Sequence, residues 1–384
     1  MRSKRVALLI EATNAYARGL LHGIARFNHE HPRWVIYFEP HGLGEPLPRW
    51  LKNWDGDGIL ARLANRRTAR AVLGLGVPLV ELRRIITIPG VPSIGPDNQK
   101  VAALAFEHFR ERGFQHFGLY EVLRNVDRPL NERSDAFLRQ VRASGFFCHV
   151  FKPERSGSLE SEQMRLAQWL RRLPKPVGVL TCNDNYGLQV LRASLRAGVM
   201  VPEEVAVLSA GNDDCLCDLC HPPLSSVDLA PELIGYEAAA LLDRMMSGKR
   251  PPSQRLEVAP KGIVTRLSTD VLATPDPAVA RTVAFIRENA CGDLRVGDVL
   301  RHVGLSRSAL EPKMKTVLGR TIHREIRRVQ LERVRSLLSS TDVPIKQIAT
   351  RTGFRNVQYL ARVFRKETGH TLAGYRKRMR WQSA

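Results

Sequence analysis

The sequence lacks the long apolar segments that place a protein in a membrane. No stretch of about 18 apolar residues occurs anywhere in the chain, so no transmembrane helix is predicted. At the N-terminus only the apolar run from Val6 to Ile10 precedes Glu11. That run is too short for the core of a signal peptide and is typical of a buried strand. We therefore expect a cytoplasmic protein with no membrane partner.

The motifs of the common enzyme classes are also missing. The chain contains no G-x-x-x-x-G-K-S/T, no H-E-x-x-H and no G-x-S-x-G sequence. Gly74-Leu-Gly76 lacks the third glycine of a dinucleotide-binding loop and precedes a predicted strand instead of following one. The histidines are scattered without catalytic or metal-ligand spacing. We expect neither an enzymatic activity nor a cofactor.

Cysteine is scarce, with six residues in 384, and reduced thiols are the expectation for a cytoplasmic chain. The loop Cys215, Cys217, Cys220 and His221 fits the C-x-x-C-H haem pattern, but covalent haem attachment normally needs an exported chain. Three sulfurs and an imidazole could bind zinc tetrahedrally, although four ligands so close in sequence make a tight site. We interpret them as ordinary small loop residues and expect no metal. A regulator that responds to metal or redox state through this loop is the alternative hypothesis.

Acidic residues are rare near the C-terminus. From Ala280 onward the chain holds 23 of its 59 Lys and Arg but only 8 of its 38 Asp and Glu. This segment carries +15 of the net charge of +21, which is typical of a domain that binds a polyanion.

The sequence from Ile345 to Tyr375 predicts a helix-turn-helix. One short helix buries Ile348, Gly353 breaks it, and a second helix begins at about Asn356. Arg and Gln side chains can read base edges through paired hydrogen bonds. On the face of the second helix we expect DNA-binding residues at Arg355, Asn356, Gln358, Tyr359, Arg362, Arg365 and Lys366.

A second helix-turn-helix is predicted upstream. Apolar residues with helical spacing precede Gly304, and Ser306 can cap the helix that follows. Pro312 lies within that helix and lacks a backbone N–H, so we expect the helix either to kink or to begin late. Its predicted DNA-binding residues are Arg307, Ser308, Glu311 and Lys315.

The residues from Gly353 to Arg376 read GF-x-N-x-x-Y-x-x-R-x-F-R-K-E-T-G-x-T-x-x-x-Y-R. This pattern resembles the signature of AraC-type transcription regulators, whose DNA-binding module contains two helix-turn-helix units. A single helix over 321–339, roughly 28 Å long, would separate the two recognition helices by nearly the roughly 34 Å repeat of DNA. Arg376 and Lys377, beyond the second unit, are expected to contact phosphate.

The region before residue 270 alternates short apolar strands with amphipathic helices. This alternation predicts parallel α/β sheets with helices on both faces, and the length suits two lobes. The expected strands are 6–10, 35–38, 58–61, 78–81, 117–120, 148–151, 177–181 and 205–209.

The end of this region resembles the effector-binding domain of LacI-type repressors. The resemblance rests on the G-x-D-D turn at Gly211, P-x-L-S-S-V at Pro222–Val227, G-x-x-A-A-x-L-L at Gly235–Leu242 and R-x-S-T at Arg266–Thr269. It implies a two-lobed, periplasmic-binding-protein-like α/β domain over 1–270, a linker over 271–279 and an all-α double helix-turn-helix domain over 280–384. Because the first strand begins near Val6, DNA binding is assigned to the C-terminal domain.

The effector is expected where α/β sheets bind ligands, at the carboxyl ends of the strands. Polar residues after predicted strands are suited to sugar hydroxyls, although they can equally be turn formers or helix caps. The candidates are Asn14, Tyr16, Asp97, Arg133, Asn183, Asp184, Asn185 and Asp213. The resemblance implies a small sugar, for which we expect a pentose such as xylose. It also implies a homodimer on a double-stranded DNA operator, acting as an activator with RNA polymerase as partner.

Overall fold

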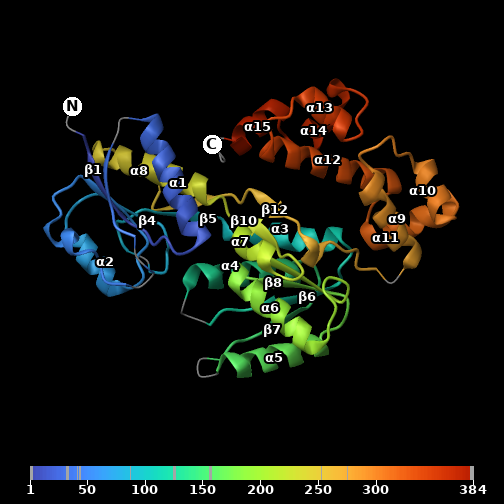
Figure 1. Ribbon diagram of the computed structural model, residues 1–384, viewed down its shortest axis with the longest axis horizontal. Coiled ribbons are helices and arrows are strands. Elements are labelled where there is room, and N and C mark those ends of the chain that lie inside the picture. Colours follow the sequence, from blue (N-terminus) through green and yellow to red (C-terminus); the bar gives the residue numbers. More distant parts are fainter. Residues whose placement is uncertain are drawn as a thin grey trace. The chain divides into compact units, whose positions relative to one another are not determined.

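The computed structural model (Figure 1) describes residues 3–31, 34–40, 42, 45–86, 88–123, 127–154, 158–251, 253–274 and 276–380, and for 339–340 and 377–380 their backbone alone. The chain divides into two compact units. The first comprises Met1–Glu107 and His116–Asp270, and the second comprises His108–Gln115 and Val271–Ala384. The second unit thus includes a short segment from within the α/β region.

The first unit contains two sheets, as the strand–helix alternation predicts. Within the described residues, the first sheet has the order β11-β5-β4-β3-β1-β2, with all neighbouring strands parallel. Its strands are β1 (Arg5–Leu9), β2 (Val35–Phe38), β3 (Gly58–Ala61), β4 (Leu79–Glu81), β5 (Ser93–Pro96) and β11 (Arg255–Val258).

The second sheet has the order β12-β10-β9-β8-β6-β7. Only the pairing of β10 with β12 is antiparallel among its described strands. Its strands are β6 (His116–Tyr120), β7 (Cys148–Phe151), β8 (Val177–Thr181), β9 (Val205–Ala210), β10 (Ser225–Asp228) and β12 (Gly262–Val264). The chain passes from the first sheet to the second after β5, and β11 returns to the first.

Helices alternate with these strands. They are α1 (Ala15–Glu30), α2 (Arg66–Leu73), α3 (Asn98–Glu111), α4 (Arg128–Ala143), α5 (Leu159–Arg172), α6 (Asp184–Ala197), α7 (Asp214–Leu219) and α8 (Pro231–Met246), with short 3-10 turns at Arg49–Asn53 and Leu267–Thr269. The last residues of α3 belong to the second unit, where the backbone N–H of Ala273 donates to the carbonyl of Arg112 at 2.8 Å.

The second unit is helical. Its helices are α9 (Pro277–Asn289), α10 (Val296–Val303), α11 (Arg307–Leu318), α12 (Ile322–Ser340), α13 (Ile345–Arg351), α14 (Val357–Thr368) and α15 (Leu372–Arg380). Helix α9 begins at Pro277, so the last part of the segment expected as a linker is helical. One apolar cluster around Leu310 and Met314 supports α10 and α11, and another around Leu360 and Phe364 supports α13 and α14.

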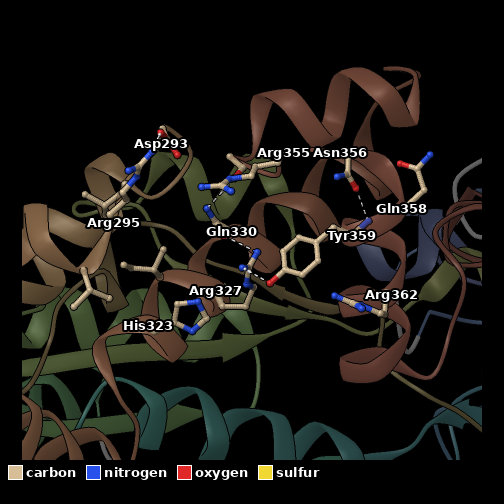
Figure 2. Close-up of a pocket in the computed structure, with 14 residues that line it drawn as sticks. Asp293, Arg295, His323, Arg327, Gln330, Arg355, Asn356, Gln358, Tyr359 and Arg362 are labelled. Atoms are coloured by element: carbon tan, nitrogen blue, oxygen red, sulfur yellow. Dashed lines mark hydrogen bonds and ion pairs between the residues drawn. The ribbon is translucent and has the colours of Figure 1, made fainter.

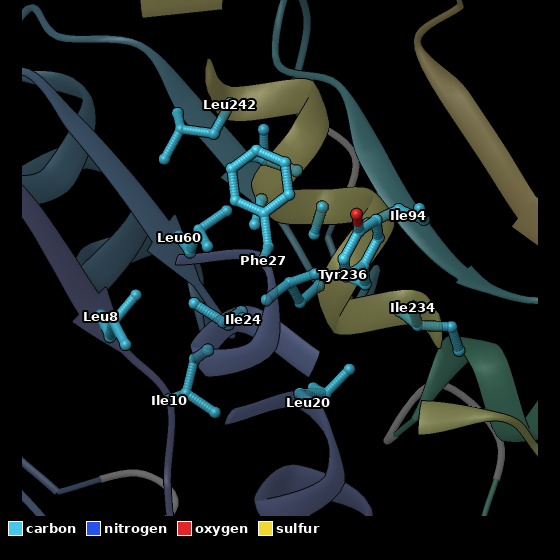
Figure 3. Packing of buried hydrophobic residues seen from close by; sticks show 14 of the residues in the cluster. Leu8, Ile10, Leu20, Ile24, Phe27, Leu60, Ile94, Ile234, Tyr236 and Leu242 are labelled. Atoms are coloured by element: carbon cyan, nitrogen blue, oxygen red, sulfur yellow. The ribbon is translucent and has the colours of Figure 1, made fainter. Parts of the chain in front are cut away.

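Helices α1 and α8 pack against each other unusually closely. Figure 3 shows their buried side chains, including Phe27 and Tyr236, in one cluster with the strands of the first sheet. A Cβ added at Gly23 would overlap the carbonyl oxygen of Glu232, and one at Gly235 would overlap that of Leu20. The two helices therefore approach through their backbones, which requires glycine at both positions.

We predict that Gly23→Ala and Gly235→Ala each destabilise the first unit. The added methyl group cannot move away from a backbone oxygen, and overpacking of this kind costs about 1–3 kcal/mol. Gly74→Ala is the matched control, because its backbone is right-handed and a Cβ there meets atoms only at 3.5 Å or more. Urea denaturation measures the effect, and equal midpoints for Gly23→Ala and Gly74→Ala would contradict the prediction.

Candidate functional site

A cavity of about 280 Å³ lies at the carboxyl ends of strands from both sheets of the first unit. Asn14 and Tyr16 reach it from the start of α1, and Arg62 follows β3. Asn183 follows β8, and Gly211 follows β9. We call this cavity the effector cleft. Its position at strand ends is the one at which α/β sheets bind small ligands.

Seven of the eight predicted effector residues line the cleft. They are Asn14, Tyr16, Arg133, Asn183, Asp184, Asn185 and Asp213. Asp97 is not among the lining residues. Its carboxylate accepts from the backbone N–H of Lys100 at 3.0 Å and pairs with the Lys100 ammonium at 3.1 Å. The structure therefore gives Asp97 a role at the start of α3 and does not bring it into the cleft.

Three of the predicted residues that line the cleft are also helix caps. The side-chain oxygen of Asn14 accepts from the N–H of Ala17 at 2.8 Å, and Asn183 caps α6 in the same way. Asp213 accepts from the N–H of Leu216 at 3.3 Å and so caps α7. A residue can therefore cap a helix and line the cleft at once, because each cap lies where a strand has just ended and the cleft begins.

Asp184 has a structural role within the cleft wall. Its side chain is 5% exposed, and one carboxylate oxygen accepts from the hydroxyls of Ser209 at 2.5 Å and Ser226 at 2.6 Å. The other oxygen accepts from the backbone N–H of Asp213 at 2.9 Å. Asp184 thus ties α6 to β9, β10 and the loop carrying Asp213, and it positions that loop more than it offers atoms to a ligand.

Arg133 is the buried cation of the cleft. It is 2% exposed, donates to the side-chain oxygen of Asn98 at 3.1 Å and to the carbonyl of Cys182 at 2.5 Å. No carboxylate in the part of the chain that the structure describes forms an ion pair with it. Burial lowers the pKa of its guanidinium, but arginine remains charged in proteins. Its remaining donor capacity is therefore available to a polar ligand.

Sequence reasoning missed three further arginines that line the cleft. Arg62 pairs with Glu11, Arg83 with Asp127 at 3.1 Å, and Arg84 with Glu257 at 3.2 Å. The rule that found Asn183 could have found Arg62 and Arg83, since both follow strands. Arg84 has a φ of 60°, a backbone conformation that is strained for a non-glycine residue and recurs at ligand sites.

The cysteine loop shows no metal-like arrangement. Among the described residues no group of three His, Cys, Asp or Glu side chains is placed to hold an ion. Cys217 and Cys220 are buried, and burial raises the pKa of both thiols. Protonated, buried thiols are poor metal ligands and poor nucleophiles, which favours the interpretation of these cysteines as packing residues.

The second unit contains the two predicted helix-turn-helix pairs, α10–α11 and α13–α14. Gly304 and Gly353 make their turns with φ of 74° and 73°, and Ser306 and Asn356 cap the second helix of each pair. Nine of the predicted DNA-binding residues are exposed. They are Arg307, Ser308, Lys315, Arg355, Asn356, Gln358, Arg362, Arg365 and Lys366.

Two of the predicted DNA-binding residues are not exposed as the helical pattern indicated. Glu311 is half-buried beside Arg307, 3.5 Å from its guanidinium. Tyr359 is half-buried and its hydroxyl accepts from Arg327 at 2.9 Å. Neither side chain projects freely from its recognition helix. Glu311 lies beside Arg307 of its own helix, whereas the partner of Tyr359 comes from α12, which the pattern of α14 does not reveal.

Helix α11 corrects the expectation about Pro312. The helix runs unbroken from Arg307 to Leu318 with Pro312 inside it, so a late start is wrong. Ser306 caps it by accepting from the N–H of Ala309 at 3.2 Å. Pro312 has no backbone N–H to donate to the carbonyl of Ser308, four residues earlier. That carbonyl lies in the first turn of the helix.

Beyond α14, the guanidinium of Arg376 donates to the carbonyl of Val343 at 2.5 Å. This contact ties α15 to the segment before α13. Lys377, predicted with Arg376 to contact phosphate, has its side chain outside the described residues.

Comparison with known proteins agrees with this two-part architecture. Residues 106–269 match the periplasmic binding protein-like domain family, and residues 299–378 match a helix-turn-helix domain family. The chain is 32% identical to the xylose operon regulatory protein of Escherichia coli (strain K12), over 97% of this chain and 96% of that one. The chain belongs to the family of xylose operon regulatory proteins. It is accordingly a sugar-responsive, DNA-binding transcription regulator with an AraC-type DNA-binding domain.

Further relatives of this family support the assignment. The regulator of the same name from Haemophilus influenzae is 29% identical over 94% of this chain and 95% of its own. A solved structure described as the xylose-binding transcription activator xylR is 31% identical, has a TM-score of 0.64 and covers 98% of both chains. The family is one of transcription regulators and not of enzymes. No helix within the described residues is long and apolar enough to cross a membrane.

We predict that Asp184→Ala lowers the stability of the first unit by about 3 kcal/mol. The change leaves two buried serine hydroxyls and one backbone N–H without their acceptor, and each such loss costs about 1–3 kcal/mol. Asn185→Ala is the matched control, because Asn185 is the next residue along α6 and is exposed. Chemical denaturation without ligand measures both variants. An unchanged midpoint for Asp184→Ala would show that the network does not support the fold.

Proposed function

We propose that xylose binds in the effector cleft and switches this regulator to activate transcription of a xylose operon in the cytoplasm. The observation that carries the proposal is Arg133, a guanidinium buried in the cleft without a carboxylate partner. Such a group can donate hydrogen bonds to sugar hydroxyls without first breaking an ion pair. The names of the relatives, which are xylose operon regulators and a xylose-binding activator, support xylose as the sugar.

The dimensions and polarity of the cleft suit a monosaccharide. A volume of about 280 Å³ lies just below the range of roughly 300–1,000 Å³ typical of drug-sized ligand sites. Arg133 and the amide of Asn185 offer donors, while the carboxylate of Asp213 offers an acceptor. Tyr16 adds an aromatic ring at the cleft wall. Donors and acceptors placed together are what vicinal hydroxyl groups require.

On the DNA side, we propose a homodimer that binds directly repeated half-sites. Helix α12 has 19 residues, so it spans roughly 28 Å between the two helix-turn-helix units. Helices α11 and α14 of one protomer can then read successive major grooves on one face of the operator. Contact with RNA polymerase would follow from the proposed role as an activator.

We predict that xylose raises the thermal stability of the full-length protein and that Arg133→Lys abolishes most of this effect. Ligand at 100 times its Kd stabilises a protein by about 2.7 kcal/mol. Lysine keeps the charge but loses the planar fork of donors. A thermal-shift titration against a panel of monosaccharides is the measurement, with each variant compared with its own ligand-free form.

Asp97→Asn is the control for this experiment. Asp97 does not line the cleft, and asparagine can still accept from the N–H of Lys100 to cap α3. It should keep the full xylose response. A full response in Arg133→Lys would remove Arg133 from the sugar site, whereas stabilisation by a different monosaccharide alone would overturn xylose as the effector.

We predict that Arg362→Ala weakens binding to the specific operator by roughly 1–3 kcal/mol and relaxes preference at one base pair. Arg362 is exposed on α14, and its guanidinium lies 5.3 Å from the centre of the Tyr359 ring. Lys346→Ala is the control. Lys346 is exposed on α13, the first helix of the α13–α14 helix-turn-helix pair. In helix-turn-helix proteins this first helix crosses the DNA backbone.

Fluorescence anisotropy on matched and shuffled duplexes at two salt concentrations distinguishes these roles. Lys346→Ala should weaken both duplexes alike and flatten the salt dependence. If Arg362→Ala also weakens both alike, Arg362 contacts phosphate and α14 does not present it to a base edge.

A further inference from the structure

A groove of about 730 Å³ lies within the DNA-binding unit, between its two helix-turn-helix pairs. Figure 2 shows the side chains that line it, and they come from three places in the sequence. Residues 293–296, which lead into α10, form one part, and α12 contributes residues that include Arg327 and Gln330. The turn before α14 and the first half of that helix form the rest. Both halves of the unit therefore contribute to one concave surface, which we call the central groove.

The central groove is positively charged. Four arginines line it against one carboxylate, that of Asp293. Asp293 is already neutralised, because it pairs with Arg295 at 3.1 Å. Arg355 and Arg362 lie on the α14 side, and both are exposed. The N-terminus of α14 adds partial positive charge from its backbone N–H groups. An anion is therefore the ligand that this surface attracts.

Arg327 is the central arginine of this groove. It donates to the hydroxyl of Tyr359 at 2.9 Å and to the side-chain oxygen of Gln330 at 3.1 Å. Its guanidinium lies 4.7 Å from the centre of the Phe354 ring and 4.9 Å from that of Tyr359. No carboxylate of the described residues forms an ion pair with it. Neutral oxygens and aromatic faces thus hold the cation in place and leave its charge unmatched by an anion.

The acceptor Gln330 is itself fixed. It is 4% exposed, and its amide nitrogen donates to the carbonyl of Ala290 at 2.8 Å. Tyr359 is fixed as well, because its backbone N–H donates to the side chain of Asn356 at 2.7 Å. Arg327 is therefore held in one orientation by residues from α12 and α14, as a preformed binding group requires.

We propose that the central groove binds backbone phosphates of the operator between the two major-groove segments that α11 and α14 read. When one protein face reads two successive major grooves, the intervening minor groove and its flanking phosphates face the protein between the two recognition helices. The central groove lies between the two pairs, and exposed residues of α14 form one of its walls. Arg327 is the contact at its centre, with Arg355 and Arg295 beside it. The inference rests on the proposed placement of α14 in the major groove.

Neutral methylphosphonate links, placed one at a time in an operator duplex obtained by in vitro selection, test the proposal. For the native full-length protein, one link between the two contacted major-groove segments should weaken binding. With Arg327→Gln the same link should have no further effect, because the charge it would have contacted is gone. Arg327→Gln should also make the salt dependence of log Kd shallower by about 1. If Arg327→Gln and the methylphosphonate link instead lower the binding free energy additively, the proposal is overturned.

Three controls separate a phosphate contact from other roles. Arg335→Gln removes an exposed charge from the same helix outside the groove, and it should show no coupling to the link that Arg327 senses. Tyr359→Phe removes the hydroxyl that orients Arg327 but keeps its charge. Tyr359→Phe should weaken the coupling between Arg327 and the methylphosphonate link but keep most of the contribution of Arg327 to the salt dependence. If the role of Arg327 were merely structural, Tyr359→Phe and Arg327→Gln would have the same effects. Thermal denaturation confirms that each variant is folded.

Inorganic phosphate distinguishes DNA from a free anion as the source of the ligand. Arg327-dependent stabilisation of the DNA-free protein by phosphate, without coupling to any methylphosphonate, would assign the groove to a small anion and overturn the proposal. Failure of the underlying DNA model gives a different result, since Arg362→Ala would then leave sequence preference unchanged whatever the phosphate links show.

Discussion

The close contact between α1 and α8 is the constraint on which the first unit depends. The chain leaves the first sheet after β5, builds the second sheet, and must then return. Helix α8 is the element that returns, and it packs on α1 with the backbones of Gly23 and Gly235 against the opposite helix. Because α1 begins with Asn14 and Tyr16 at the cleft, this contact also fixes one wall of the effector site. Glycines far apart in sequence therefore act on the same site.

The strands that sequence reasoning predicts are those with a continuous apolar core. The eight expected strands all occur, with ends shifted by at most one residue, because each carries a run of apolar residues. Most of these runs are buried, whereas Val35–Phe38 is a largely exposed strand at the edge of the first sheet. The strands Ser93–Pro96, Arg255–Val258 and Gly262–Val264 were missed. Their sequences are short and partly polar, and β11 pairs with β5 from a distant part of the chain. Such strands depend on a partner that a local pattern does not contain.

Sequence reasoning brought most of its candidate effector residues into one cavity but did not predict what each side chain does there. Polar residues after buried strands must lie at one end of the sheets, and that rule found Asn183 and Asp213. It could not tell that Asp184, next in sequence, is bound by serines from β9 and β10. Nor could it place Asp97, whose carboxylate bonds to the backbone N–H of Lys100 and pairs with its ammonium group outside the cleft, although it too follows a strand.

The recognition helices show the same limit. Helical periodicity predicts which face of α14 is exposed, but Tyr359 lies at the edge of that face, where Arg327 from α12 covers it. A residue of the connecting helix thereby enters the candidate DNA surface, and no motif in its own neighbourhood marks it. The sequence signature of the helix-turn-helix predicts the helices of each pair. It does not predict the central groove, which forms only when both helix-turn-helix pairs pack against α12.

The effector cleft and the central groove both contain several arginines, and they differ in how many of those arginines form ion pairs with carboxylates. In the effector cleft Arg62, Arg83 and Arg84 each have a carboxylate partner, and Arg133 is the exception. A cleft whose charges are mostly matched suits an uncharged ligand rich in hydroxyl groups, because a charged one would have to break those pairs. In the central groove Arg327 is held by neutral acceptors and aromatic rings. Its charge costs less to bring to a phosphate, since no ion pair must be broken first.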